Sequence, residues 1–187
     1  ETGHSVRLMS IGFMVPEEQA MIWRGPMLHS AIRQLLSDVD WGELDYLIID
    51  LPPGTGDAAL SLSQAIPLTG AVIVTTPQDV ALADVRRGTA MFNRLGVPIL
   101  GVVENMSYFA CPHCGQRTDV FRADGGKKTS KQLGVSFLGH VPLDAEVCAA
   151  GDVGVPIVAA HPESPQSQGF REIASQLSEE LIERGTE

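Results

Sequence analysis

The sequence predicts an α/β protein built on a mostly parallel, doubly wound sheet. Short apolar runs, such as residues 71–75 and 98–103, alternate with stretches of helical periodicity, such as residues 80–95. Short apolar runs bounded by turn residues are typical of strands buried on both faces, and strands that alternate with helices form βαβ units. A chain of 187 residues can bury a substantial core, so we expect residues 1–187 to form a single domain.

The expected elements can be placed in order along the chain. Residues 6–12 read as a first short strand, and Pro26 suits the first position of a helix that runs to about residue 38, because its missing N–H costs nothing there. The elements expected after this helix are strand 45–50, helix 57–65, strand 71–75, helix 80–95, strand 98–103, helix 126–133, strand 136–141, a short helix from Asp144 and a closing helix 167–184. The closing helix is amphipathic, with Phe170, Ile173, Leu177 and Leu181 on one stripe.

Composition excludes several classes of function. The net charge of −10 argues against a protein that binds nucleic-acid backbones, which requires Lys and Arg. We find neither a bilayer-length apolar run nor a signal peptide, and the 3 cysteines do not make a disulfide framework. We therefore expect a cytoplasmic protein with no membrane and no nucleic-acid partner. Because an apparent strand follows residue 5 with no element before it, we expect the chain to be part of a longer protein.

The stretch 46–57 carries the main chemical signal. The apolar run 47–49 ends on Asp50, and a turn-rich loop, Pro-Pro-Gly-Thr-Gly, follows at once. An acid at the carboxyl end of a parallel strand lies where ligands bind in open α/β folds, and in phosphate-processing sites such an acid holds Mg²⁺, usually through water. We interpret Asp50 as a Walker-B-type carboxylate and residues 51–57 as a nucleotide-sensing loop.

Two other interpretations of this stretch remain open. Asp50 could be an ordinary strand end, with Asp57 as the cap of the next helix. Residues 54–59 also fit a loose GxGxxA dinucleotide motif, with Asp79 about twenty residues farther on. The two prolines would stiffen the turn that a dinucleotide pyrophosphate must enter, which favours the metal–nucleotide interpretation.

A long insertion, residues 104–125, interrupts the alternation and contains the Cys-x-x-Cys pair Cys111 and Cys114. This spacing brings two thiolates onto one ion, but closed Zn²⁺ and Fe–S sites usually need four ligands. A second copy of the chain could complete the site, His113 or Cys148 could contribute, or the pair could be a redox dithiol. A plain exposed turn is the simplest alternative.

Motifs spread over nearly the whole chain resemble one known family. They are 9–13 (MSIGF), 23–27 (WRGPM), 45–57 (DYLIIDLPPGTGD), 75–78 (TTPQ), 101–107 (GVVENMS) and 111–115 (CPHCG). In this order they resemble the Mrp/NBP35 (ApbC-like) family of iron–sulfur cluster carrier ATPases, relatives of the MinD/ParA deviant-Walker-A NTPases. The resemblance implies a P-loop NTPase fold, ATP and Mg²⁺ as cofactors, and a [4Fe–4S] cluster that is passed to apo iron–sulfur client proteins.

The resemblance also implies roles for particular residues. Asp50 would be the Walker B acid near Mg²⁺, and Gly54 with Asp57 would belong to the loop that senses the γ-phosphate, so that Asp50 and Asp57 are the candidate catalytic residues. Asn105 would hydrogen-bond the adenine edge, for which an amide has both a donor and an acceptor. Pro142 would close the base pocket.

The cysteine pair gains a definite role from the same resemblance. Cys111 and Cys114 would bind a [4Fe–4S] cluster that bridges two subunits of a homodimer, so that each subunit supplies two thiolates. Arg24 lies in a motif of the family, and we expect a structural role for it. The lone histidines, His140 among them, are expected at the surface or in packing, and Cys148 is expected to be a small buried residue on a helix.

One family feature is absent from the sequence. The phosphate-binding loop GKGGxGK[ST] does not occur, and residues 125–129 (GGKKT) lack the required spacing. We therefore expect the chain to lack the first βα unit of the fold and not to hydrolyse ATP by itself. The alternatives are a metal-binding or interaction module without nucleotide turnover and a MinD/ParA-like regulatory ATPase.

Overall fold

The computed structural model describes residues 6–13, 25–52 and 56–185. The chain divides into two compact units, Glu1–Leu68 and Thr69–Glu187, and each unit is described by itself below. The expectation of a single domain stays a prediction.

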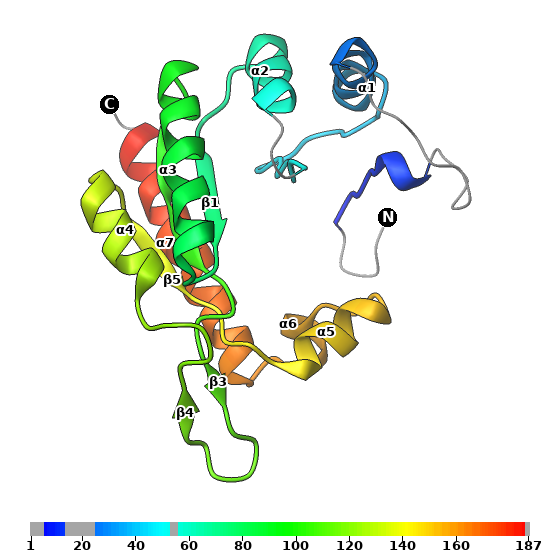
Figure 1. Ribbon diagram of the computed structural model, residues 1–187. Coiled ribbons are helices and arrows are strands. Elements are labelled where there is room, and N and C mark those ends of the chain that lie inside the picture. The colour runs from blue at the N-terminus through cyan, green and yellow to red at the C-terminus, as the bar shows by residue number, and fades with distance from the viewer. Residues whose placement is uncertain (1–5, 14–24, 53–55, 186–187) are drawn as a thin grey trace. The chain divides into compact units, whose positions relative to one another are not determined.

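The regular elements described in the first unit are helices. A short 3₁₀ turn, η1 (Ile11–Phe13), precedes α1 (Gly25–Ser37) and α2 (Gly56–Ala65), and the two helices pack against each other. Both helices lie where the sequence predicts them (Figure 1). Trp41 follows α1 and donates its indole N–H to the carbonyl oxygen of Leu35, at 2.9 Å, which ties the chain after the helix to the last turns of α1.

Two of the expected strands are wrong. Residues 6–12 end in the first part of η1, and residues 45–50 belong to neither a helix nor a strand, with no strand paired to them among the described residues. The side chains of Tyr46 and Ile48 are 58% and 88% exposed. An apolar run becomes a strand only where a neighbouring strand accepts its backbone hydrogen bonds, and neither segment has such a neighbour in the described part of the chain.

The second unit contains the predicted parallel sheet. Its strands are β1 (Ala71–Thr75), β2 (Ile99–Glu104) and β5 (Phe137–His140), in the order β1-β2-β5, and both pairs are parallel. The register sets Thr75 beside Glu104 and Glu104 beside His140. The three strands therefore end in register with one another at the same edge of the sheet.

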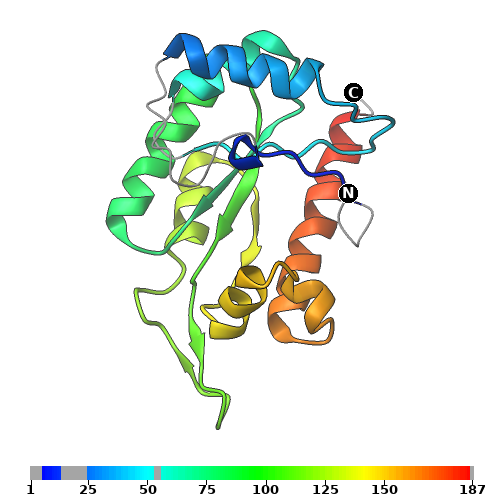
Figure 2. The ribbon, with the colours of Figure 1, turned by 90° about the vertical axis from the view of Figure 1, so that its right-hand side faces the viewer.

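Helices cover both faces of this sheet, as the doubly wound expectation requires. On one face, α3 (Asp79–Arg94) packs on β1, α4 (Gly125–Leu133) packs on β2 and β5, and the two helices touch each other. On the other face, α7 (Pro165–Gly185) packs on β2 and β5, as Figures 1 and 2 show. Two further helices, α5 (Ala145–Asp152) and α6 (Ile157–Ala160), precede α7, and α6 packs against it.

The core of the unit lies on β2 and β5. Every residue of β2 is buried, and Val103, Leu138 and Val141 form a cluster that Val72 completes from β1. From the predicted stripe of the closing helix, Ile173 and Leu177 pack on this cluster, whereas Phe170 stays 38% exposed.

A short antiparallel hairpin, which the sequence analysis did not predict, projects from the region after β2. It consists of β3 (Phe109–Ala110) and β4 (Arg117–Thr118) and lies within the predicted insertion. The strands are too short to give a periodic signal, which is why only the insertion itself was predicted. No helix among the described residues has the length and apolar character needed to span a membrane.

We expect Leu138→Ala to lower the free energy of unfolding by about 2–5 kcal/mol, because truncating a side chain that is 1% exposed leaves a cavity between the sheet and α7. Urea unfolding followed by circular dichroism measures the change. Val80→Ala, at a position that is 80% exposed, is the control and should change the value little. Equal effects of the two substitutions would contradict the position of the core.

Candidate functional site

The carboxyl edge of the sheet is the first candidate site. Thr75, Glu104 and His140 end β1, β2 and β5 side by side, and the loops that follow these strands carry Thr76, Asn105 and Pro142. Ligands of open α/β sheets bind outside this edge, where the loops diverge. The level register therefore brings residues from distant parts of the sequence to one place.

Asn105 is held at this edge by backbone contacts. Its N–H donates to the carbonyl oxygen of Thr75 at 2.7 Å, and its side-chain Oδ1 accepts from the N–H of Met106 at 2.9 Å. A cavity of about 390 Å³ lies beside it, lined by Thr75, Thr76, Asp84 and Asn105 together with apolar residues of β1 and α3. A carbonyl oxygen has two lone pairs, so the amide keeps both donor and acceptor capacity toward this cavity.

Pro142 lies next to the Asn105 loop. Val141 donates its N–H to the carbonyl oxygen of Glu104 at 2.9 Å, and the N–H of Ser107 donates to the carbonyl oxygen of Val141 at 3.0 Å. These two bonds continue the β2–β5 pairing past the strands, and Pro142 itself is buried. Asn105 and Pro142 therefore follow neighbouring strands at the same sheet edge, but Pro142 does not line the cavity beside Asn105, and the base pocket stays a prediction.

The acidic candidates Asp50 and Asp57, and the predicted nucleotide-sensing loop of residues 51–57, belong to the first unit. Asp50 is exposed at the end of the unpaired segment 45–50, and Asp57 is exposed in the first turn of α2, where the helix dipole favours a carboxylate. Gly54 lies outside the described residues. The roles of Asp50, Gly54 and Asp57 stay predictions.

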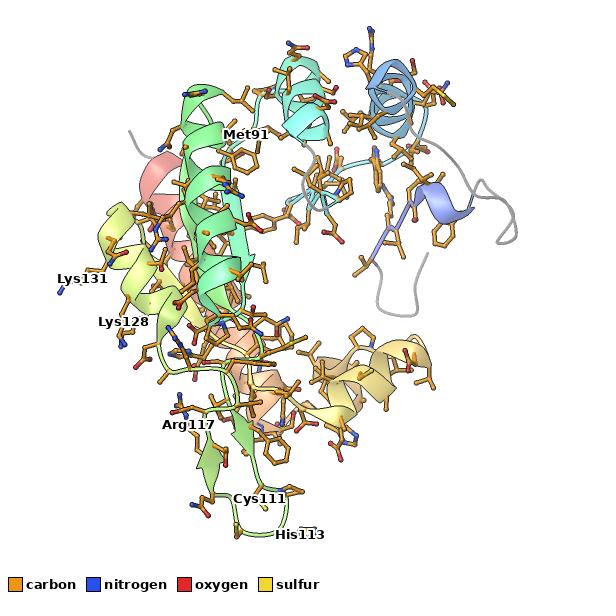
Figure 3. The ribbon with its side chains drawn as sticks, in the orientation of Figure 1. Met91, Cys111, His113, Arg117, Lys128 and Lys131 are labelled. Atoms are coloured by element: carbon orange, nitrogen blue, oxygen red, sulfur yellow. The ribbon has the colours of Figure 1, made fainter. Side chains whose placement is uncertain are left out.

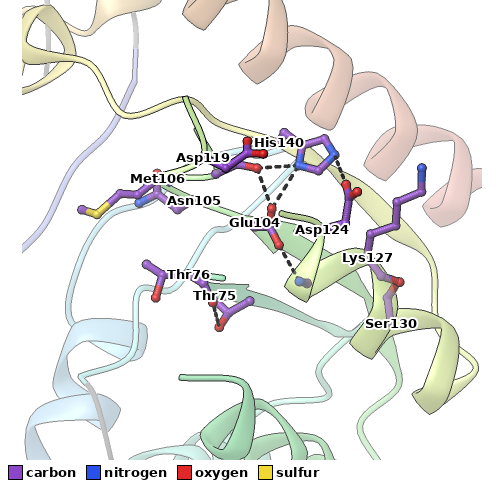
Figure 4. A network of polar contacts seen from close by, with 12 residues as sticks. Thr75, Thr76, Glu104, Asn105, Met106, Asp119, Asp124, Lys127, Ser130 and His140 are labelled. Atoms are coloured by element: carbon purple, nitrogen blue, oxygen red, sulfur yellow. Dashed lines mark hydrogen bonds and ion pairs between the residues drawn. The ribbon is translucent and has the colours of Figure 1, made fainter. Parts of the chain in front are cut away.

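A cluster of polar side chains lies at the carboxyl edge and is formed by Glu104, Ser107, His140 and Asp124. Figure 4 shows Glu104, His140 and Asp124 in this cluster. The Glu104 side chain is fully buried, and its Oε1 accepts a hydrogen bond of 2.5 Å from the Ser107 hydroxyl. The His140 Nδ1 lies 2.8 Å from the Ser107 Oγ and 3.3 Å from the same carboxylate oxygen, and its Nε2 lies 3.7 Å from the Asp124 Oδ1.

Sequence reasoning missed this cluster, although a signal for it existed. Glu104 is an acid at the end of the apolar run 99–103, which is the same pattern that singled out Asp50. His140 was expected at the surface or in packing. It is half-buried, and its ring meets that of Phe137 edge-on at 4.7 Å, so the packing interpretation is right but incomplete.

The start of α4 explains the Gly-Gly-Lys-Lys-Thr segment. The N–H of Gly126 donates to the Glu104 Oε2 at 2.5 Å, so a carboxylate of the chain itself occupies the positive end of this helix. A Cβ on Gly126 would lie 3.1 Å from the same oxygen, which explains the glycine. Lys127 and Lys128 are exposed, and this agrees with the expectation that the segment is not a phosphate-binding loop.

The cysteine pair occupies the turn of the β3–β4 hairpin and is the second candidate site (Figure 3). The Cys111 N–H donates to the carbonyl oxygen of Gln116 at 3.0 Å, and the N–H of Gly115 donates to the carbonyl oxygen of Cys111 at 2.8 Å. Hydrogen bonds from the backbone N–H groups of His113 and Cys114, and then from the Cys114 side chain, lower the pKa of the Cys111 thiol from its usual value. The turn therefore favours a thiolate at Cys111.

The candidate metal ligands at the hairpin are the two cysteine thiols. Cys111 is half-buried, Cys114 is exposed and both are free thiols. Among the described residues no group of three or more His, Cys, Asp or Glu side chains is arranged to hold a metal ion, so neither His113 nor Cys148 completes the site there. Cys148 lies on α5 as predicted, but its expected burial is wrong. The α5 helix buries only Ala150, and Cys148 lies on its solvent-facing side.

Comparison with known proteins shows the family to which the chain belongs. Residues 1–178 match the family described as ParA, NUBPL iron-transfer P-loop NTPase. The chain belongs to this family. It is 52% identical over 178 residues to the iron–sulfur cluster transfer protein NUBPL of Dictyostelium discoideum, a match that covers 95% of this chain and 55% of that protein.

A second relative of this NUBPL-type chain is the iron–sulfur cluster carrier protein of Deinococcus radiodurans, 54% identical over 181 residues, with 97% of this chain and 51% of the relative covered. The chain thus spans about half the length of the curated relatives it matches.

Solved structures show the same fold for this member of the NUBPL family. The nucleotide-binding protein of Archaeoglobus fulgidus, solved in complex with ADP, superposes with a TM-score of 0.63 at 42% identity, covering 68% of this chain and 53% of that one. The cell-division ATPase MinD of Pyrococcus furiosus superposes with a TM-score of 0.60 at 22% identity, covering 83% and 59%. The fold is therefore the P-loop NTPase fold of the MinD type, as the sequence predicted.

We expect Cys111 to be alkylated by iodoacetamide at pH values where an ordinary thiol is still mostly protonated, because its lowered pKa gives thiolate at lower pH. The measurement is the rate of labelling of Cys111 against pH, read by mass spectrometry of the peptide. Cys114→Ala removes one of the stabilising contacts and should move the midpoint to higher pH, whereas Cys148→Ala should leave it unchanged. A midpoint at or above that of free cysteine would contradict the assignment.

Proposed function

We propose that this chain is part of an iron–sulfur cluster carrier, in which Cys111 and Cys114 hold one side of a [4Fe–4S] cluster and the same two residues of a second copy hold the other side. The observation that carries the proposal is the pair of free thiols on the hairpin turn, one of them with a lowered pKa. The relatives named as carrier or transfer proteins for iron–sulfur clusters support it.

The two-thiol site suits a cargo that must leave again. A structural metal site closes its coordination with ligands of one chain, whereas a cluster held by two thiolates from each of two chains is released when the chains part. The hairpin turn is exposed, so an apo client protein can approach the cluster directly. We therefore propose apo iron–sulfur proteins as partners, with no membrane and no nucleic acid in the reaction.

Nucleotide binding is the second part of the proposal. Asn105 would recognise the adenine edge and Pro142 would close the pocket on it, which is supported by their common position at the sheet edge and by the ADP named with the Archaeoglobus fulgidus protein. Asp50 would hold Mg²⁺ through water, with Gly54 and Asp57 near the γ-phosphate. The bound Mg²⁺ would neutralise phosphate charge.

The proposed compartment is the cytoplasm, where thiols such as those of Cys111 and Cys114 stay reduced. A relative from Arabidopsis thaliana, 46% identical over 180 residues, carries a name that places that protein in mitochondria. Fractionation of cells that express the tagged protein from its own gene tests the proposed compartment.

Anaerobic reconstitution with iron and sulfide tests the carrier function. We expect about one [4Fe–4S] cluster per two chains, seen as visible absorbance together with a doubled mass in solution. Cys111→Ala/Cys114→Ala should abolish both, while the matched control Cys148→Ala should abolish neither. Zinc in place of iron, or a Cys111–Cys114 disulfide, would contradict the carrier and favour a metal-binding module or a redox dithiol.

We expect no Mg²⁺-dependent ATP hydrolysis by the purified chain. Its 187 residues contain no GxxxxGK[ST] loop, and the one Gly-Gly-Lys segment begins α4 with its Gly126 N–H bonded to Glu104. Without the backbone cradle and lysine of such a loop, the phosphates lack most of the electrostatic stabilisation that transfer requires. Phosphate release on addition of ATP and Mg²⁺ is the measurement, and turnover that Asp50→Asn abolishes would contradict the expectation.

A further inference from the structure

The Glu104 side chain is a fully buried carboxylate that the proposed function does not use. Burying a carboxylate is costly unless its oxygens are hydrogen-bonded, and here each oxygen has a donor. The Ser107 hydroxyl donates to Oε1 and the Gly126 N–H donates to Oε2, each at 2.5 Å. One side chain thus ties the end of β2 to the loop that follows it and to the start of α4, 22 residues farther along the chain.

The first of these segments is the Asn105 loop. Met106 has a left-handed backbone, with φ of 52°, which a residue with a side chain adopts only where its surroundings hold it. The Asn105 Oδ1 accepts from the Met106 N–H on one side of this turn, and Ser107 is bonded to Glu104 and Val141 on the other. The turn is therefore clamped at both ends.

The second segment is the start of α4, and His140 contacts residues at both segments. The His140 Nδ1 lies between the Ser107 Oγ and the Glu104 Oε1, and its Nε2 faces Asp124, the residue before α4. In Figure 4 the His140 ring lies between the Glu104 carboxylate on one side and the Asp124 carboxylate on the other. The cluster thus joins the ends of β2 and β5, the Asn105 loop and α4.

The hairpin that carries the cysteines begins at the same loop. Tyr108 directly follows Ser107, and its carbonyl oxygen accepts from the Leu143 N–H at 2.7 Å. Phe109 pairs with Leu143, and the Arg117 guanidinium of β4 lies 4.0 Å from the centre of the Tyr108 ring. The root of the hairpin is therefore one residue away from the bonds that Glu104 makes.

A Ser–His–carboxylate group can also be a nucleophilic centre, but the geometry excludes that here. Ser107 is fully buried, so its hydroxyl reaches no substrate. The carboxylate contacts the hydroxyl directly, whereas in a triad it would orient the far nitrogen of the histidine. The cluster is built to hold backbone segments in place.

We propose that Glu104 is a positioning residue that links the root of the cysteine hairpin to the Asn105 loop and to the start of α4, so that metal binding at Cys111 and Cys114 is transmitted to both. This proposal rests on the proposed function in one respect, that the thiols bind metal. The other part of the proposal, that the Glu104 hydrogen bonds to Ser107 and Gly126 hold the two segments in place, does not depend on metal binding.

The experiment is amide hydrogen exchange by NMR on the whole chain, with and without Zn²⁺, a diamagnetic probe that thiolates bind. In the wild type, Zn²⁺ should slow exchange in the hairpin and, about threefold or more, at Ser107 and Gly126 as well, because protection spreads through bonded segments. In Glu104→Gln, Zn²⁺ should still protect the hairpin while the effect at Gly126 is lost. A merely structural role of Glu104 would not remove this coupling selectively.

Two further variants keep the result clear. Val103→Ala weakens the same strand without touching the cluster and should retain the Zn²⁺ effect at Gly126, and Ser107→Ala should lose it if Glu104→Gln does not fold. An undiminished Zn²⁺ effect at Gly126 in Glu104→Gln or Ser107→Ala would overturn the proposal.

The experiment also separates this proposal from the proposed function. If the wild type binds no Zn²⁺, the metal site and the transmission fail together, and exchange without metal then tests the clamp. Loss of a charge-assisted bond predicts that Gly126 exchanges about tenfold faster in Glu104→Gln. An unchanged exchange rate of Gly126 in Glu104→Gln would also overturn the proposal that Glu104 holds the start of α4 in place.

Discussion

The carboxylate of Glu104 is the interaction on which the arrangement of both candidate sites in the second unit depends. It ends the most buried strand of the sheet, and its two oxygens bond the Asn105 loop and the first turn of α4. A helix N-terminus that is filled by an acid of the same chain needs no external anion. The cavity beside Asn105, where we propose that nucleotide binds, and the cysteine hairpin therefore share one internal support, which explains how a loop with a left-handed Met106 keeps a defined shape.

Much of the second unit could be predicted from the sequence, because its elements repeat a simple local pattern. Strands β1, β2 and β5 are short apolar runs between turn residues, and α3 and α7 show periodic apolar positions, so each was recognised within a few residues of its bounds. Segment 45–50 has the same apolar pattern but no strand beside it in the described part of the chain, and local pattern carries no information about partners. The two-residue strands β3 and β4 are too short for any periodicity.

The candidate sites divide in a similar way. Asn105 and Pro142 were found because ordered motifs resembled a family, and the structure places both at one sheet edge. Cys111 and Cys114 were found from their Cys-x-x-Cys spacing, and they lie on one hairpin turn. The Glu104 cluster was missed because its members come from separate parts of the sequence and meet only in the folded chain. Glu104 and His140, for example, are 36 residues apart. A rule that looks for acids at the ends of apolar strands would have found Glu104 together with Asp50.

The exposure of Cys148 has a practical consequence for the oligomeric state. A thiol on the outer side of α5 can form a disulfide with a second chain in air, and such a dimer contains no iron. A doubled mass observed after aerobic purification would then report oxidation at α5 and not assembly at the hairpin. A reductant distinguishes the two kinds of dimer. It separates chains joined by a Cys148 disulfide on α5, and it preserves the thiolates that hold a cluster at the hairpin.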